Sequence, residues 1–318
     1  MQKETVTSEP VIRQDSRSSV QKAILRALLY YDIWEYPLTM KELHCFLPVN
    51  GLDYDRFRSL LEKEGPGEAV RRSGEYFFLS SRSPEIVETR QEREKNAARL
   101  WKIARVSMHV IKRFPFVRGV FVSGDLSKNA TKKESDVDFF LVTTAHRVWI
   151  SRTLLILFKK IFLFNQKKYF CLNNFTAVGH LQLDERNLFY ATEIAHLTPL
   201  FNSGLHREYL QENRWIRDFF PNFDPAVLAR PRVSERGSLL QRLLELPFSL
   251  IPSDRLDQFL MQRMQKVWAT RYPGFDQQTR HRIFRSTRGE SRAYVGNYQD
   301  RVIELYRKRL HDYGLDEH

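Results

Sequence analysis

The chain contains almost no cysteine: its 318 residues include only Cys45 and Cys171. These two lie far apart and form no CxxC pair, which excludes a disulfide framework or a cysteine-based zinc ribbon and predicts a reducing, cytoplasmic location. Signatures of zinc enzymes and hydrolases are also missing, because the 9 histidines show no HExxH spacing and no GxSxG motif occurs. Zinc-dependent and serine-hydrolase chemistry are therefore not expected.

Long hydrophobic runs are lacking as well. The longest apolar stretch, residues 154–164, is interrupted by Lys159 and Lys160 and is too short to span a membrane. The N-terminal residues include charged side chains but no apolar core, so they do not form a signal peptide. We expect a cytoplasmic protein with no membrane partner.

Acidic residues are the minority among the charged side chains. The chain has 51 Lys and Arg against 38 Asp and Glu, a formal net charge of +13. A basic protein attracts polyanions, which leaves nucleotide phosphates, nucleic acid and anionic lipid as partner classes. The hydrophobic fraction of 42% is sufficient for globular cores.

Changes in composition and pattern divide the chain into five predicted segments. They are a disordered lead at 1–18, a winged-helix-like module at 19–82, a connecting helix at 83–115, an α/β core at 116–200 and a helical C-terminal region at 201–318.

The module at 19–82 is predicted from three helices followed by a hairpin. A Thr39–Glu42 capping box starts its second helix, and residues 70–79 form the hairpin. The expected recognition helix, 53–64, carries four acidic and three basic side chains. Because contact with DNA phosphates favours a basic helix, duplex DNA is not the expected partner. A structural or docking role is favoured over that of a DNA-binding regulator.

The most informative stretch joins two apolar strands. The first strand ends in Ser123-Gly124, and the second begins with Ser135-Asp-Val-Asp138. Side chains alternate along a strand, so Asp136 and Asp138 share one face while Val137 points to the other. Two carboxylates beside a small-residue turn can hold a divalent metal against a polyphosphate.

This pattern resembles the DNA polymerase β-like nucleotidyltransferase superfamily, with Gly124 at the family's glycine and Ser135–Asp138 at its Ser-Asp-hydrophobic-Asp. Other segments resemble an uncharacterised prokaryotic branch of that superfamily with an N-terminal winged-helix-like module: Tyr36–Thr39, Pro115–Arg118, Cys171–Asn173 and Asn297–Gln299. The resemblance implies an α+β fold. A mixed nucleotidyltransferase sheet at 116–200 would be flanked by the module and by the helical C-terminal region.

The resemblance also implies a function and a set of site residues. The protein would transfer NMP from an NTP to an acceptor by a two-metal, in-line mechanism and release pyrophosphate. Asp136 and Asp138 would be catalytic and bind two Mg²⁺ ions. The nucleotide-binding turn would consist of Ser123, Gly124, Asp125, Ser127 and Lys128. RNA, a protein or a small molecule stay open as the acceptor.

Two departures from the family pattern keep a second hypothesis open. Asp125 stands where the family has serine, and the strand at 170–178 has Asn173 and Asn174 but no acid at the position of the third carboxylate. The next carboxylates are Asp184 and Glu193. The alternative is a catalytically degenerate, nucleotidyltransferase-like protein that binds a nucleotide or RNA and acts in regulation.

A basic cluster follows in the C-terminal region. If this segment were helical, one face would carry Arg282, Arg285, Arg288 and Arg292. Two interpretations stay open, a binding site for phosphate or acceptor and a solvated basic face with local ion pairs to Glu290 and Asp300.

Overall fold

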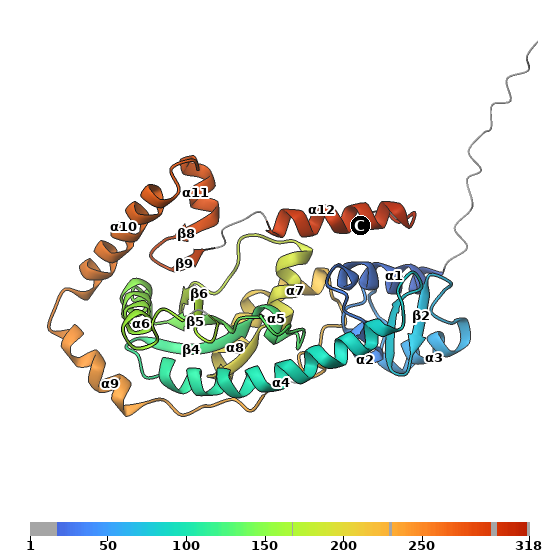
Figure 1. Cartoon of the computed structure of the whole chain (residues 1–318), viewed down its shortest axis with the longest axis horizontal. Coiled ribbons are helices and arrows are strands. Elements are labelled where there is room, and N and C mark those ends of the chain that lie inside the picture. Colours follow the sequence, from blue (N-terminus) through green and yellow to red (C-terminus); the bar gives the residue numbers. More distant parts are fainter. Residues whose placement is uncertain (1–17, 167, 229–230, 294–297, 317–318) are drawn as a thin grey trace, which may run out of the picture.

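The computed structural model describes residues 18–166, 168–228, 231–293 and 298–316 (Figure 1). Apart from Ser18, the predicted lead at 1–18 lies outside these residues. The described part combines many helices with a three-stranded and a six-stranded sheet, so the predicted α+β class is confirmed. Within these residues, no helix combines the length and the apolar character that crossing a membrane requires.

The N-terminal residues form a small helical unit with its own antiparallel sheet, in the strand order β1-β3-β2. The predicted capping box is confirmed: Thr39 Oγ1 accepts a hydrogen bond from the Glu42 N–H, and Glu42 Oε2 accepts one from the Thr39 N–H. The elements are α1 (Ser19–Tyr31), the 3-10 turn η1 (Asp32–Trp34), β1 (Leu38–Thr39), α2 (Met40–Cys45), α3 (Tyr54–Glu64), β2 (Val70–Ser73) and β3 (Tyr76–Leu79).

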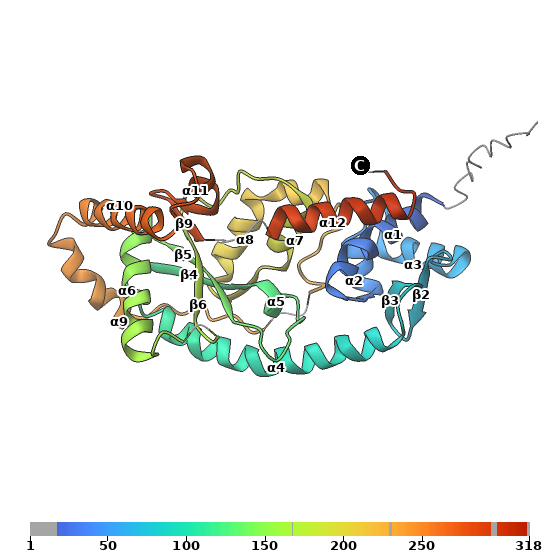
Figure 2. The same ribbon diagram turned by 45° about the horizontal axis from the view of Figure 1, so that its top comes forward.

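The long helix α4 (Glu85–Ile111) connects this unit to the larger sheet and runs beneath both (Figures 1 and 2). Its first half carries two buried arginines that bond to the N-terminal unit: Arg90 donates to the Pro37 carbonyl and to Glu42, and Arg93 donates to the Trp34 carbonyl. Its second half buries one apolar side against the large sheet. The two parts are therefore held together by one continuous helix.

The large sheet has the strand order β7-β4-β5-β6-β9-β8. Among the strands described, β5 and β6 are the one parallel pair, and α6 (Val148–Phe162) connects them. The strands are β4 (Val117–Ser123), β5 (Asp138–Thr143), β6 (Cys171–Ala177), β7 (Thr198–Phe201), β8 (Phe284–Ser286) and β9 (Glu290–Ala293).

Alternation along the strands gives the sheet two buried faces. Phe139 and Leu141 pack with α4 and α6, whereas Phe140 and Val142 belong to a core shared with the N-terminal unit. Helices α7 (Leu188–His196) and α8 (Ser203–Glu212) and the 3-10 turn η2 (Arg214–Asp218) contribute to this second core. The large sheet and the N-terminal unit therefore share one buried hydrophobic core.

The C-terminal region differs in part from the prediction of a helical segment at 201–318. It contains α9 (Leu239–Glu245), the 3-10 turn η3 (Leu246–Ser249), α10 (Ser253–Arg271), α11 (Gln277–Ile283) and α12 (Tyr298–Asp312). It also supplies the β8–β9 hairpin, which extends the sheet beyond the predicted core at 116–200. Phe284 and Ser286 are buried on either side of the half-buried Arg285, a period of two that suits a strand.

The last helix returns to the beginning of the chain. Arg309 on α12 forms an ion pair of 2.6 Å with Asp32, directly after α1, and Arg82 pairs with the same carboxylate at 2.7 Å. Since Asp32 is buried, these two guanidinium groups compensate its charge. The two ion pairs hold α12 against the segment that follows α1.

Candidate functional site

A tight turn joins β4 to the single-turn helix α5 (Gly124–Ser127). Gly124 has a φ of +68°, a left-handed conformation that glycine adopts without the strain of a Cβ. A Cβ at this position would also lie 2.7 Å from Asp138 Oδ2, which is closer than van der Waals contact permits. Glycine is thus required both by the backbone angle and by the carboxylate beside it.

Asp138 stands at the start of β5, opposite Ser123 in the antiparallel pairing of β4 and β5. It shares a strand face with Phe140, while Val137 and Phe139 pack into the core on the other side. Asn173 Nδ2 donates a hydrogen bond of 3.2 Å to Asp138 Oδ1. The carboxylate therefore lies between the glycine turn and β6.

Burial raises the pKa of the Asp138 carboxyl. A hydrogen bond from Cys171 lowers it, and the negative charges of Asp136, Asp125 and Glu193 raise it further. These carboxylates are thus near enough to repel Asp138 electrostatically. A bound cation would relieve that repulsion.

Asp125 follows the glycine and is exposed. Its carboxylate accepts a hydrogen bond of 2.9 Å from Ser135 Oγ, which ties it to the loop before β5. Ser127 is buried and donates to the Gly124 carbonyl oxygen at 2.8 Å, so its hydroxyl closes the turn. In this arrangement neither Asp125 nor Ser127 offers a hydrogen-bond donor to a phosphate group.

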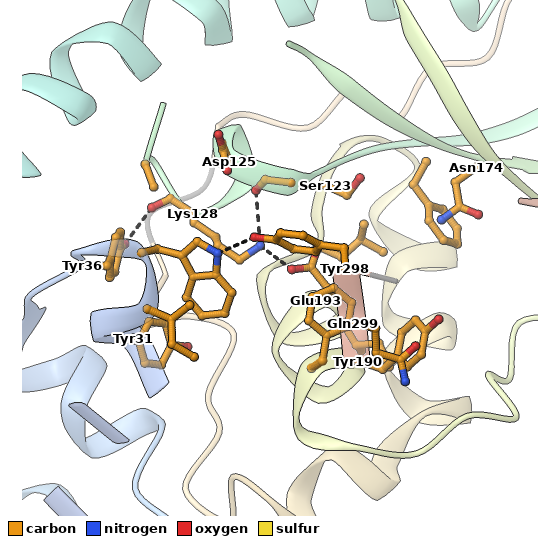
Figure 3. Close-up of a pocket in the computed structure, with 18 of the residues that line it drawn as sticks. Tyr31, Tyr36, Ser123, Asp125, Lys128, Asn174, Tyr190, Glu193, Tyr298 and Gln299 are labelled. Carbon is orange, nitrogen blue, oxygen red and sulfur yellow. Dashed lines mark hydrogen bonds and ion pairs between the residues drawn. The ribbon is translucent and has the colours of Figure 1, made fainter. Parts of the chain in front are cut away.

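Lys128 forms an ion pair of 2.6 Å between its Nζ and Oε1 of Glu193 on α7 (Figure 3). Its Nζ also lies 3.5 Å from the Gly124 carbonyl oxygen, and Tyr36 Oη donates to its backbone carbonyl at 2.7 Å. A phosphate that binds Lys128 must therefore compete with the Glu193 carboxylate.

Glu193 is the carboxylate that the sequence could not place. The structure brings it to the glycine turn, while Asp184 lies elsewhere and pairs with Arg285 at 3.0 Å. On β6, where the family has its third carboxylate, Asn173 contacts Asp138 and the buried Asn174 pairs across the ladder with Phe140.

A cavity of about 940 Å³ opens beside the turn, between the N-terminal unit, the sheet, α7 and α12. Ser123, Gly124, Asp125 and Lys128 are among the described residues that line it, whereas Asp136 and Asp138 are not. Asp138 lies next to the cavity wall, because a Cβ added to Gly124, which lines the cavity, would be 2.7 Å from Asp138 Oδ2.

The cavity has an aromatic wall that sequence reasoning missed. It is lined by Tyr31, Trp34, Tyr36, Phe189, Tyr190 and Tyr298. Trp34 Nε1 donates to Tyr298 Oη at 2.6 Å, which links the N-terminal unit to α12 across the cavity (Figure 3). The only feature of the sequence that points to this wall is the density of aromatic residues between 30 and 36. The aromatic rings suit a planar ligand.

The cations around the cavity are largely ion-paired. Carboxylates bind four of them, in the pairs Arg82–Asp32, Arg93–Glu35, Lys128–Glu193 and Arg292–Glu290. The cavity therefore combines positive and negative charge and is not a simple basic pocket for anions.

The four arginines at 282–292 do not share a helix face, because β8 and β9 form a hairpin within this segment. Arg285 and Arg292 are opposite each other in the ladder. Arg285 pairs with Asp184 and Glu185, and the buried Arg292 pairs with Glu290 at 3.0 Å. This is close to the interpretation of local ion pairing, although Arg292 also lines the cavity.

The chemistry of the carboxylates fits a Mg²⁺ ion that is shared with a substrate. Among the residues described, no three or more His, Cys, Asp or Glu side chains gather into a group that could hold a metal. Mg²⁺ is commonly held by one or two carboxylates together with substrate phosphates. Asp138, with the Asn173 amide bonded to it and the negative charge of Asp136 nearby, can supply the protein part of such a site.

Comparison with known proteins gives no independent guide, because no family model, curated protein or solved structure matches the chain.

Proposed function

We propose that this chain is a Mg²⁺-dependent nucleotidyltransferase that transfers NMP from an NTP to an acceptor and releases pyrophosphate. The fold would be the nucleotidyltransferase fold with an N-terminal winged-helix-like module. The order helix, strand, helix, helix, strand, strand between 19 and 79 supports the module. The central position of β5 between β4 and β6 supports the fold.

One observation carries the proposal: the close approach of Asp138 to the glycine turn at the wall of the cavity, where a Cβ at position 124 would lie 2.7 Å from Asp138 Oδ2. A carboxylate pressed against a side-chain-free turn allows a phosphate to approach the backbone and a carboxylate-bound cation together. The cavity volume of about 940 Å³ is within the range of small-molecule sites.

Each residue then has a defined part. Asp136 and Asp138 would hold Mg²⁺, which, when bound, neutralises charge on the phosphate oxygens and on the leaving pyrophosphate. Gly124 leaves room for the triphosphate. Lys128 would release its ion pair with Glu193 and neutralise one phosphate of the bound NTP instead. The rings of Tyr190 and Tyr298 would contact the base. An acceptor oxygen forms the new bond to the α-phosphorus as the bond to pyrophosphate breaks.

A catalytically degenerate, nucleotide- or RNA-binding protein is the second candidate, and β6 favours it. Asn173 contacts Asp138 where the family has a third carboxylate, and an amide cannot take a proton from the acceptor at neutral pH. Such a protein would use the same cavity to hold a nucleotide without turnover.

Isothermal titration with ATP, GTP, CTP and UTP, with and without Mg²⁺, tests the site. We expect NTP binding that depends on Mg²⁺ and is lost in Asp136→Ala/Asp138→Ala. Asp184→Ala is the matched control, because that carboxylate pairs with Arg285 outside the described lining of the cavity. Binding that is independent of Mg²⁺ and unchanged in the double variant would refute both the metal site and the enzyme.

Pyrophosphate release with a panel of RNA, protein and small-molecule acceptors separates the two candidates. Release that is abolished by the double variant supports the transferase. Mg²⁺-dependent binding without release from any acceptor supports the regulatory protein.

A further inference from the structure

Helix α9 is attached to the protein by its polar side. Gln241 is buried and its amide donates to the carbonyl oxygens of Phe114 and Val117. Glu245, one turn later, accepts hydrogen bonds from the Phe116 N–H at 2.6 Å and from Arg118 at 2.8 Å. The face of α9 that contacts the body is therefore hydrophilic.

The opposite side of α9 and the turn after it expose leucines to solvent. This leucine face consists of Leu239, Leu240, Leu243, Leu244, Leu246 and Leu250. Leu239 is 76% exposed, Leu243 60% and Leu250 86%. Amphipathic helices of globular proteins normally bury this side, and large contiguous apolar patches on a protein mark sites of interaction.

More apolar surface lies at the same end of the molecule. The end of α6 exposes Ile161, Phe162 and Phe164. In both views α6, α9 and α10 lie together at the end opposite α1 (Figures 1 and 2). This end of the molecule therefore exposes apolar side chains from α6 as well as from α9.

The exposed charges next to α9 and along α10 are mainly positive. Arg236 and Arg242 flank or belong to α9, and the exposed part of α10 carries Arg255, Arg263 and Lys266. Two exposed acids lie in the same stretch: Asp254 is bound to Arg147, and Glu235 accepts hydrogen bonds from the Ser203 N–H. The partner that covers these leucines should therefore carry negative charge.

We propose that the leucine face binds the surface of a membrane rich in anionic phospholipid, with α9 lying in the plane of the interface. Leucines enter the acyl boundary while neighbouring arginines and lysines meet the phosphate headgroups. A second copy of the chain fits less well, because packing two such faces together would bring their arginines side by side.

The expectation of no membrane partner came from the lack of an apolar run long enough to span a bilayer. A helix that lies in the interface does not need such a run, because only one of its sides enters the lipid. Leucines at 239, 240, 243 and 244 provide that side within two turns.

Co-sedimentation with vesicles tests the proposal. We expect the full chain to sediment with vesicles of three parts phosphatidylcholine and one part phosphatidylserine, and far less with phosphatidylcholine alone. The Leu243→Ser/Leu250→Ser variant should bind the acidic vesicles at least about tenfold more weakly, since each leucine that leaves water contributes measurably. Arg242→Gln/Arg255→Gln should lose on the order of tenfold and much of its salt dependence.

Leu305→Ser, a partly exposed leucine on α12, is the matched control and should bind like the wild type. Because the substituted leucines are exposed, circular dichroism should show unchanged folding in all variants. Two results would overturn the proposal: no sedimentation with acidic vesicles at low salt, or a dimer in sedimentation velocity that the leucine substitutions dissociate while vesicles are not bound.

Discussion

Globular proteins normally bury apolar side chains and expose charged ones. The cavity and the leucine face both depart from this rule: the cavity has partly buried charges beside it, and the leucine face exposes apolar side chains. Beside the cavity, Asp138 lies partly buried near three other carboxylates, and Lys128 and Glu193 pair at 2.6 Å. On α9 the polar Gln241 is buried, while Leu250 is 86% exposed. The first region buries charged side chains, and the second exposes leucine side chains to solvent.

Stability of the isolated chain explains neither arrangement. Burying carboxylates near one another costs free energy, and exposed leucines forgo the gain from burial. Under the two proposals the regions bind different partners, a cation with phosphate at the cavity and an anionic membrane surface at α9. Substitutions that restore the usual arrangement in one region should leave the other unaffected.

The largest effect is expected at Gly124. In Gly124→Ala the new Cβ would meet Asp138 Oδ2 at 2.7 Å, so the turn and the carboxylate must move apart. A displacement of this kind at a reacting centre lowers turnover by about a hundredfold. Isothermal titration and pyrophosphate release measure the loss.

Gly51→Ala is the control for Gly124→Ala, because Gly51 has the same φ of +68° and a Cβ added there would meet no atom within 4 Å. It should show only the backbone penalty of roughly 1 kcal/mol in urea unfolding, with normal NTP binding. Equal NTP binding in both variants would mean that Gly124 and Asp138 do not form the nucleotide site.

Asp257 provides a buried charge at the leucine end of the molecule. Its carboxylate on α10 accepts hydrogen bonds of 2.9 Å from the N–H groups of Trp149 and Ile150 at the start of α6. Burial raises its pKa to about 6, against the lowering effect of these two hydrogen bonds. The protonated folded state is therefore favoured relative to the unfolded chain.

The stability that comes from this raised pKa is complete below about pH 4 and is lost as the pH rises through about 6. The change is on the order of 3 kcal/mol, because each pKa unit corresponds to about 1.4 kcal/mol. Urea unfolding across this range should show the decline in the wild type and in the exposed control Asp254→Asn. Asp257→Asn should not show it, and an unchanged slope in that variant would contradict the assignment.

Local chemistry made part of this molecule predictable from the sequence. The Thr39–Glu42 capping box and the approach of Gly124 to Asp138 depend on residues close in sequence or on adjacent strands. The β8–β9 hairpin was not predicted, since arginines at spacings of three and four imitate a helix face. Ladder pairing with β6 decided its conformation instead.

Tertiary packing decided the rest of the candidate site. Glu193 reaches Lys128 only because α7 packs beside the turn, and the aromatic wall requires α12 to return to the N-terminal unit. The exposure of the leucine face could not be predicted either, because leucines at helical spacing normally predict a buried side. Gln241 donates hydrogen bonds to the carbonyls of Phe114, before β4, and Val117, at the start of β4, and these bonds turn the polar side of α9 inward.

Gln241→Leu tests whether polar anchoring orients α9. The substitution leaves the carbonyls of Phe114 and Val117 without their donor, which should destabilise the fold by about 2 kcal/mol in urea unfolding. The exposed neighbour Leu243→Ala should change stability by less than about 0.5 kcal/mol. Greater stability in Gln241→Leu would show that α9 prefers to bury its apolar side.

The smallest effect is expected at the ion pair that holds Lys128. Glu193→Gln removes the carboxylate that competes with phosphate for the Lys128 ammonium group, and it removes one of the charges that raise the pKa of Asp138. A partly buried pair of this kind is worth about 1 kcal/mol, so NTP affinity should rise about fivefold in isothermal titration. Glu185→Gln, which also lines the cavity but pairs with Arg285, should leave the affinity unchanged. Weaker NTP binding in Glu193→Gln would instead assign the Glu193 carboxylate to the cation site beside Asp138, as the third acid that β6 lacks.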